Sequence, residues 1–118
     1  MADHALFFGF GEVIPGREQT AARIFGETLE HLGQLVQEGQ ITGVEPFLLE
    51  RHGGELNGFL LIRGEREALA HLRTSEAFDR IVVRAGMVTQ RVGVVAASTG
   101  AEVQRLMGEF QQAADELG

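Results

Sequence analysis

Hydrophobic and polar positions change period several times along the chain, and each change indicates a new element. In residues 6–14 (LFFGFGEVI) apolar or small residues occupy both alternating faces, which is typical of a strand covered on two sides. From residue 17 to about 38, apolar residues recur every three or four positions, which predicts an amphipathic helix. Gly39 is placed to end that helix in a left-handed conformation. The chain is therefore predicted to begin with a strand and a long helix.

Two short apolar runs then predict a hairpin. Residues 44–51 (VEPFLLER) form the second predicted strand, and Pro46 favours an edge position because proline has no N–H to donate. Residues 52–55 (HGGE) predict the connecting loop. Residues 56–63, in which Phe59 and Leu61 alternate with Leu60 and Ile62, predict a central strand that is apolar on both faces.

The last third of the chain predicts a broken helix, a strand and a final helix. The second helix begins at about Glu65, breaks at residues 74–75 and ends at Gly86. A fourth strand is predicted at residues 90–97, and residues 99–102 (TGAE) match a capping box that starts the last helix. That helix has a one-sided apolar stripe, formed by Val103, Leu106, Met107, Phe110, Ala114 and Leu117.

The order β-α-β-β-α-β followed by a helix predicts the fold class. Right-handed crossovers give an α+β, ferredoxin-like unit with a four-stranded antiparallel sheet, in which the first and third strands are central. Residues 1–118 are expected to form a single domain of this kind.

The helices of such a unit cover one face of the sheet, yet the strands are apolar on both faces. Exposing the second face would forfeit roughly 1.5–3 kcal/mol for each large side chain. An apolar patch of that size marks an interface. We therefore expect a homodimer whose sheets close face to face into a dimeric α+β barrel. The alternative is a monomer whose last helix covers the second face.

One stretch resembles a known family. The sequence GFLLIRGEREALAHLRTSEAFDR (58–80), with Ala70-His71 followed by Ser75 and Phe78, is similar to the dimeric α+β-barrel superfamily. Within that superfamily it most resembles antibiotic-biosynthesis-monooxygenase domains. The superfamily includes cofactor-independent oxygenases, haem-degrading enzymes, isomerases and proteins without known activity. The resemblance implies a small-molecule cavity between the sheet and the helices, with His71 near it.

His71 is the candidate catalytic residue, because a neutral imidazole can accept a proton near pH 7. The alternative is a solvated histidine on the polar side of its helix. Arg63 and Arg91, at the ends of strands, are candidates for holding a carboxylate or enolate, with Glu12 as their counter-ion. The remaining candidate substrate-binding residues are Phe8, Phe10 and Phe59.

Composition narrows the partners. The net charge of −7 argues against nucleic acid, which needs a basic surface, and no apolar run predicts a membrane span or a signal peptide. The chain has no cysteine, which suits a reducing cytoplasm. His4, His31 and His52 share no ligand spacing with His71, so no metal is expected, and FGFGE has too few glycines for a nucleotide turn, so no cofactor is expected.

Two functions remain open. The first is a protein that binds a small apolar or aromatic molecule, and that, if it is an enzyme, acts as a cofactor-free oxygenase or isomerase. The second is a non-catalytic dimerisation or ligand-sensing module whose barrel is filled by its own side chains, since the chain has eight phenylalanines.

Overall fold

The computed structural model describes residues 3–118, which form four strands and four helices. In chain order they are β1 (His4–Phe10), α1 (Glu18–Gln37), β2 (Gly43–Leu48), β3 (Gly58–Gly64), α2 (Arg66–Arg73), α3 (Glu76–Val88), β4 (Gly93–Ser98) and α4 (Gly100–Leu117).

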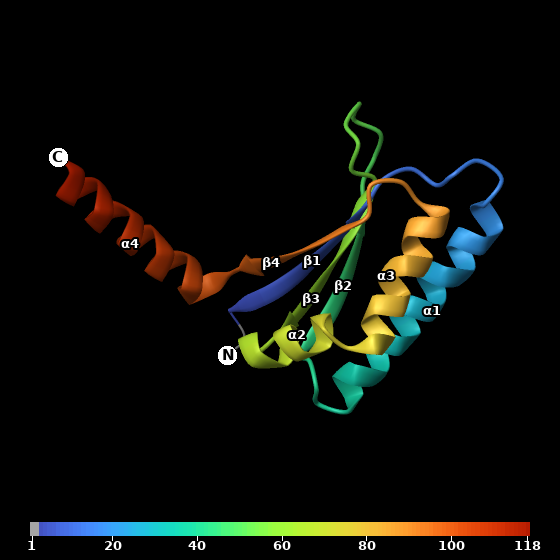
Figure 1. The fold of residues 1–118 in the computed structure, drawn as a ribbon, viewed down its shortest axis with the longest axis horizontal. Coiled ribbons are helices and arrows are strands. Elements are labelled where there is room, and N and C mark those ends of the chain that lie inside the picture. The colour runs from blue at the N-terminus through green and yellow to red at the C-terminus, as the bar shows by residue number, and fades with distance from the viewer. Residues whose placement is uncertain (1–2) are drawn as a thin grey trace.

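The strands form one antiparallel sheet in the order β2-β3-β1-β4. The two central strands are β1 and β3, as predicted, and Pro46 lies on the edge strand β2. Helices α1, α2 and α3 lie on one side of the sheet (Figure 1). The chain therefore has the ferredoxin-like α+β fold that the pattern of apolar residues predicted.

The core lies between this sheet and the helices. Leu6 and Phe8 from β1, and Leu60 and Ile62 from β3, are almost fully buried there. Phe78 of α3 is 1% exposed and packs edge to face on Phe8, with ring centroids 5.8 Å apart. Every second residue of the central strands thus faces the core, in agreement with the two-residue alternation in the sequence.

The break between α2 and α3 lies where the sequence predicted it. Ser75 precedes α3 in an extended conformation, and its Oγ accepts a hydrogen bond from the N–H of Phe78 at 3.2 Å. The same hydroxyl donates to the carbonyl of Leu72 at 2.7 Å. Ser75 therefore caps α3 and ties it to the last turn of α2.

Several boundaries differ from the prediction, and two of them have a visible cause in the backbone hydrogen bonds. Strand β1 ends at Phe10 rather than residue 14, because Gly11 donates its N–H to Gln90 outside the sheet ladder and only Val13 pairs again, with Thr89. Helix α3 continues past Gly86 to Val88, since its backbone ladder is kept up to the bond from Thr89 N–H to Ala85.

The predicted capping box at the start of α4 is wrong. The Thr99 side chain makes no capping hydrogen bond, and the Glu102 carboxylate turns along the helix to Arg105, whose Nε donates to it at 2.9 Å. An arginine three residues ahead competes successfully for the carboxylate that the box would have used.

The second face of the sheet carries a stack of three aromatic rings. Phe59 stacks between Phe7 and Phe47, with centroid distances of 4.8 Å and 4.7 Å. Gly9 lies directly opposite Phe59, and a Cβ there would meet the Phe7 ring at 2.7 Å. The missing side chain lets the Phe7 ring reach over to Phe59. We call this surface, with Leu61 and Val95, the open face.

Helix α4 does not cover the open face. It continues from the end of β4 away from the rest of the fold (Figure 1), and none of its residues is buried. The alternative in which the last helix covers the second face of its own sheet is therefore wrong. Within residues 3–118, no helix is long and apolar enough to span a membrane.

Candidate small-molecule site

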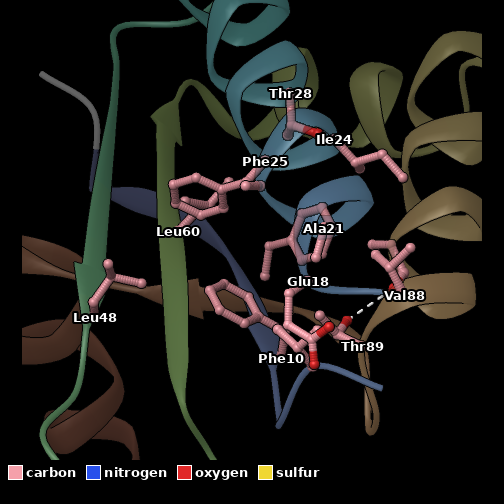
Figure 2. A pocket seen from close by; sticks show the side chains of 14 residues that line it. Phe10, Glu18, Ala21, Ile24, Phe25, Thr28, Leu48, Leu60, Val88 and Thr89 are labelled. Atoms are coloured by element: carbon pink, nitrogen blue, oxygen red, sulfur yellow. Dashed lines mark hydrogen bonds between the residues drawn. The ribbon is translucent and has the colours of Figure 1, made fainter. Parts of the chain in front are cut away.

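A pocket of about 280 Å³ lies between the sheet and helices α1 and α3. Figure 2 shows side chains from both helices and from the strands surrounding it. The residues that line it are Phe8, Phe10, Val13, Glu18, Ala21, Ala22, Ile24, Phe25, Thr28, Leu48, Leu60, Ala85, Val88 and Thr89.

Small residues on α1 leave this space open. Ala21, which is buried, and Ala22, which is exposed, both line the pocket from α1, so no long side chain fills the gap there. Phe25, one turn further on, packs edge to face against Phe10, with centroids 5.9 Å apart. The pocket is therefore lined by three aromatic rings, Phe8, Phe10 and Phe25, and by two alanines of α1.

The position of the Phe10 ring depends on Gly58, its partner on β3. A Cβ at Gly58 would meet the Phe10 ring at 2.8 Å and the backbone oxygen of Phe47 at 2.6 Å. The glycine therefore allows the ring to lie flat against the strand.

Among the described residues 3–118, three polar side chains line the pocket. Thr89 donates its hydroxyl to the carbonyl of Ala85 at 2.8 Å (dashed line in Figure 2), so its hydrogen is already used. Glu18 accepts a hydrogen bond from the N–H of Gly16 at 3.1 Å and is exposed, so its carboxylate can accept further bonds. Thr28 is buried ten residues further along α1, about 15 Å away at 1.5 Å per residue. The pocket can hold an apolar molecule that donates a hydrogen bond at its Glu18 end.

The structure separates the residues that the sequence proposed for ligand binding. Phe8 and Phe10 line the pocket. Phe59 and Arg63 belong to the opposite, open face of the sheet, where Phe59 lies in the aromatic stack. Glu12 is exposed and lies beside the loop between β2 and β3, in a separate shallow hollow.

The predicted pairing of the arginines with Glu12 is wrong. Arg63 pairs with Glu45 on the neighbouring strand at 3.4 Å, and Arg91 pairs with Glu55 at 3.0 Å. The cause is that β1 ends before Glu12, so that residue leaves the face on which strand alternation would have placed it.

His71 is exposed on α2 and does not line the apolar pocket. It borders a different hollow of about 410 Å³, between α2 and the turn that follows α1, with Glu67 and Gln40. The imidazole has no hydrogen-bonded side chain to orient it among the described residues. Within residues 3–118, no three histidine or carboxylate side chains converge as a metal site requires.

Sequence reasoning missed several lining residues. Ala21 and Thr28 lie within the predicted helix of residues 17–38 and were not singled out as site residues, and Glu18, Leu48, Val88 and Thr89 carried no motif. One signal was available in the sequence. The first half of α1 carries alanines and a threonine, whereas its second half carries leucines.

A second hollow, of about 420 Å³, lies where α4 leaves the fold. Arg66 and Arg73 of α2 and Glu102 and Arg105 of α4 line it, with His4 at the start of β1. The hydrogen bond from Arg105 lowers the pKa of Glu102 below its ordinary value, and the charges of Arg105, His4 and Arg66 lower it further. The charged side chains of this hollow are mainly basic, so we call it the basic hollow.

Comparison with solved structures identifies proteins of the same fold. A dimeric protein of unknown function with a ferredoxin-like fold from Bacteroides fragilis NCTC 9343 aligns with a TM-score of 0.58 and 10% identity, covering 81% of this chain and 96% of the other. A candidate antibiotic biosynthesis monooxygenase from Bacteroides thetaiotaomicron VPI-5482 aligns with a TM-score of 0.58 and 14% identity, covering 81% and 89%.

SnoaB, a cofactor-independent oxygenase from Streptomyces nogalater, aligns with a TM-score of 0.54 and 13% identity over 83% of this chain and 94% of that chain. No protein-family model matches the sequence, and comparison with curated proteins gives no match. The fold that the resemblance implied is confirmed, because these similar structures include proteins of the antibiotic-biosynthesis-monooxygenase type. At these identities the likeness concerns the fold.

Proposed function

We propose that this protein binds a small, largely apolar molecule in the pocket between its sheet and helices α1 and α3. The observation that carries the proposal is the pocket itself, whose walls are apolar apart from Glu18, Thr28 and Thr89. Ligand pockets commonly combine apolar walls with a few polar groups that fix orientation.

The volume limits the size of the ligand. A dry apolar cavity of about 150 Å³ in another protein's core holds a benzene molecule. The pocket here, at about 280 Å³, has nearly twice that volume. We therefore propose a ligand with one ring or two fused rings, or an aliphatic molecule of similar size.

The charge at the open end limits its chemistry. The Glu18 carboxylate accepts hydrogen bonds and repels anions, so a phenol or quinol fits better than an aromatic carboxylate. A cofactor-independent oxygenase shares the fold, which supports testing phenolic compounds first. Oxygenation or isomerisation of such a ligand stays a prediction from the sequence. A role for His71 as base would require substrate in the hollow beside α2, which it borders.

We further propose that the protein acts as a homodimer through its open face. Phe7, Phe47 and Phe59 stack there and are only partly buried by the described residues of the chain, and Val95 is 56% exposed. One protein of the same fold is described as dimeric. Closing two open faces would fill the barrel with these rings, which favours the self-filled barrel as a second candidate. The cytoplasm stays the proposed location.

Ligand binding is tested by calorimetric titration of the wild-type protein with hydroquinone, 1-naphthol and 1-naphthoic acid. We expect 1-naphthol to bind more tightly than 1-naphthoic acid, which has the same rings and an anionic group. Changing Glu18→Gln should reduce that preference, since it removes the repelling charge. If none of the three compounds binds, or if the acid binds best, the proposal is wrong.

The dimer is tested by sedimentation velocity. Wild-type protein should sediment at twice the 12.8 kDa chain mass at micromolar concentration. Phe59→Glu should give the monomer, because it places two charges in the closed barrel of a symmetric dimer. The control, Glu30→Gln on the exposed side of α1, should remain dimeric. A monomeric wild type would refute the proposed dimer and leave the ligand proposal standing.

A further inference from the structure

Helix α4 has an apolar stripe that the described residues of its own chain leave largely exposed. Val103 and Leu106 are 40% exposed, Met107 61%, Phe110 70% and Leu117 91%. Most helix stability in proteins comes from packing of the apolar face, so an 18-residue helix with an exposed stripe lacks its main source of stability. The sequence therefore specifies a covered helix, while the described residues of its own chain leave it uncovered.

The stripe continues into other uncovered surface. Leu106 borders the basic hollow between α4 and α2, together with Ala96 and Ala97 of the edge strand β4. The open face begins on that same strand, with Val95. The stripe thus reaches the edge strand β4, which also carries Val95 of the open face.

The open face alone is small for a stable dimer. Four strands about 4.8 Å apart and about 20 Å long give roughly 400 Å² in plan, whereas stable interfaces bury about 800 Å² on each partner. Helix α4 is about 27 Å long at 1.5 Å per residue. Its stripe adds contact area of the size that the open face lacks.

We infer that α4 is an exchanged arm, which packs by its stripe against a second copy of this chain and completes the dimer interface. The inference rests on the proposed dimer. In a twofold arrangement each copy gives one arm and receives one, so both stripes are covered by the same contact. The core of each copy contains no residue of α4, so changes in the arm leave the fold intact.

Two matched variants test the arm. Phe110→Glu places a charge in the stripe, and Gln112→Glu places the same charge about 200° around the helix at 100° per residue. Phe110→Glu should raise the dimer dissociation constant about a hundredfold, roughly tenfold for the ring lost from each of two arms. Gln112→Glu should leave the constant close to that of wild type. Equal constants for both variants and the wild type would overturn the inference.

Hydrogen exchange measured by mass spectrometry on wild-type protein identifies what covers the arm. The amides of α4 should be protected when the protein is dimeric and exchange rapidly on dilution to monomer, while β3 stays protected in both. Rapid exchange of α4 in the dimer would show an uncovered arm. Protection that survives dilution would show that α4 packs on its own chain. Either result overturns the inference, as does a monomeric wild type.

The ligand proposal is separable from this one. Every residue that lines the apolar pocket lies outside α4. Phe110→Glu should therefore bind 1-naphthol as the wild type does. Absence of binding in the wild type, with the arm results as expected, would refute the ligand proposal alone.

Discussion

Narrowing the apolar pocket by one side chain should separate two-ring from one-ring ligands. Ala21 lies on the α1 wall, is 8% exposed, and packs with Ile24 and Val88. In Ala21→Leu, each of the three added carbons occupies about the space of a water molecule, roughly 30 Å³. The pocket would lose roughly 90 Å³, which is about a third of its 280 Å³. The space left still exceeds the roughly 150 Å³ that admits benzene.

We therefore expect Ala21→Leu to weaken 1-naphthol binding at least about tenfold, or about 1.4 kcal/mol, and to leave phenol or hydroquinone binding nearly unchanged. The change in stability should be small. Burying three more carbons contributes up to about 2.4 kcal/mol, and overpacking costs about 1–3 kcal/mol. The urea midpoint should thus move little, which shows whether the variant is folded when binding is measured.

Calorimetric titration of both ligands into the wild type, Ala21→Leu and Ala101→Leu provides the comparison. Ala101 is exposed in the first turn of α4 and does not line the pocket, so Ala101→Leu is a matched control for Ala21→Leu. Ala85→Leu narrows the pocket from α3 and gives an independent check. Equal loss of both ligands would refute the size argument, and no loss of 1-naphthol would show that it binds elsewhere.

Three further predictions concern the fold and the arm. Phe78→Ala should lower the free energy of unfolding by about 3–5 kcal/mol, because a ring 1% exposed leaves a cavity against Phe8, and a loss below about 1 kcal/mol in urea denaturation would contradict this packing. Ser75→Ala should cost about 0.5–2 kcal/mol in the same assay, with Ser75→Asp retaining most of the stability, and equal losses for both would exclude capping. In an NMR titration Glu102 should titrate below the ordinary glutamate pKa, and Arg105→Gln should raise it, whereas no change would contradict the ion pair. Because the folded-state pKa is lowered, the stabilisation is present at neutral pH and is lost as the pH falls through that pKa.

The order of the elements and the faces of the sheet could be predicted because they depend on local period. Leu60 and Ile62 alternate with Phe59 and Leu61, and the structure places the two pairs on opposite faces of β3. Pro46 identified an edge strand for a reason contained in its own backbone. Such features need no knowledge of distant residues.

The strand ends and the site could not be predicted in the same way. Strand β1 ends at Phe10 because Gly11 finds a partner in Gln90, which lies far away in sequence. Continuing the alternation past that point placed Glu12 on the wrong face. The pocket depends on what is missing at Ala21 and Ala22, and an absent side chain produces no motif. His71 was a candidate because an imidazole can act as a base, but its position relative to the pocket depends on tertiary packing.

Because Gly58 approaches the Phe10 ring so closely, the size of the pocket depends on a residue that does not line it. Gly58 does not line the pocket, yet a Cβ on Gly58 would lie only 2.8 Å from the Phe10 ring. Any larger residue at this position would push against the ring from behind and against the rigid backbone of Phe47. Evolution could therefore change which molecules fit by a substitution on the strand, while every residue in contact with the ligand stayed the same. A search for specificity confined to lining residues would overlook it.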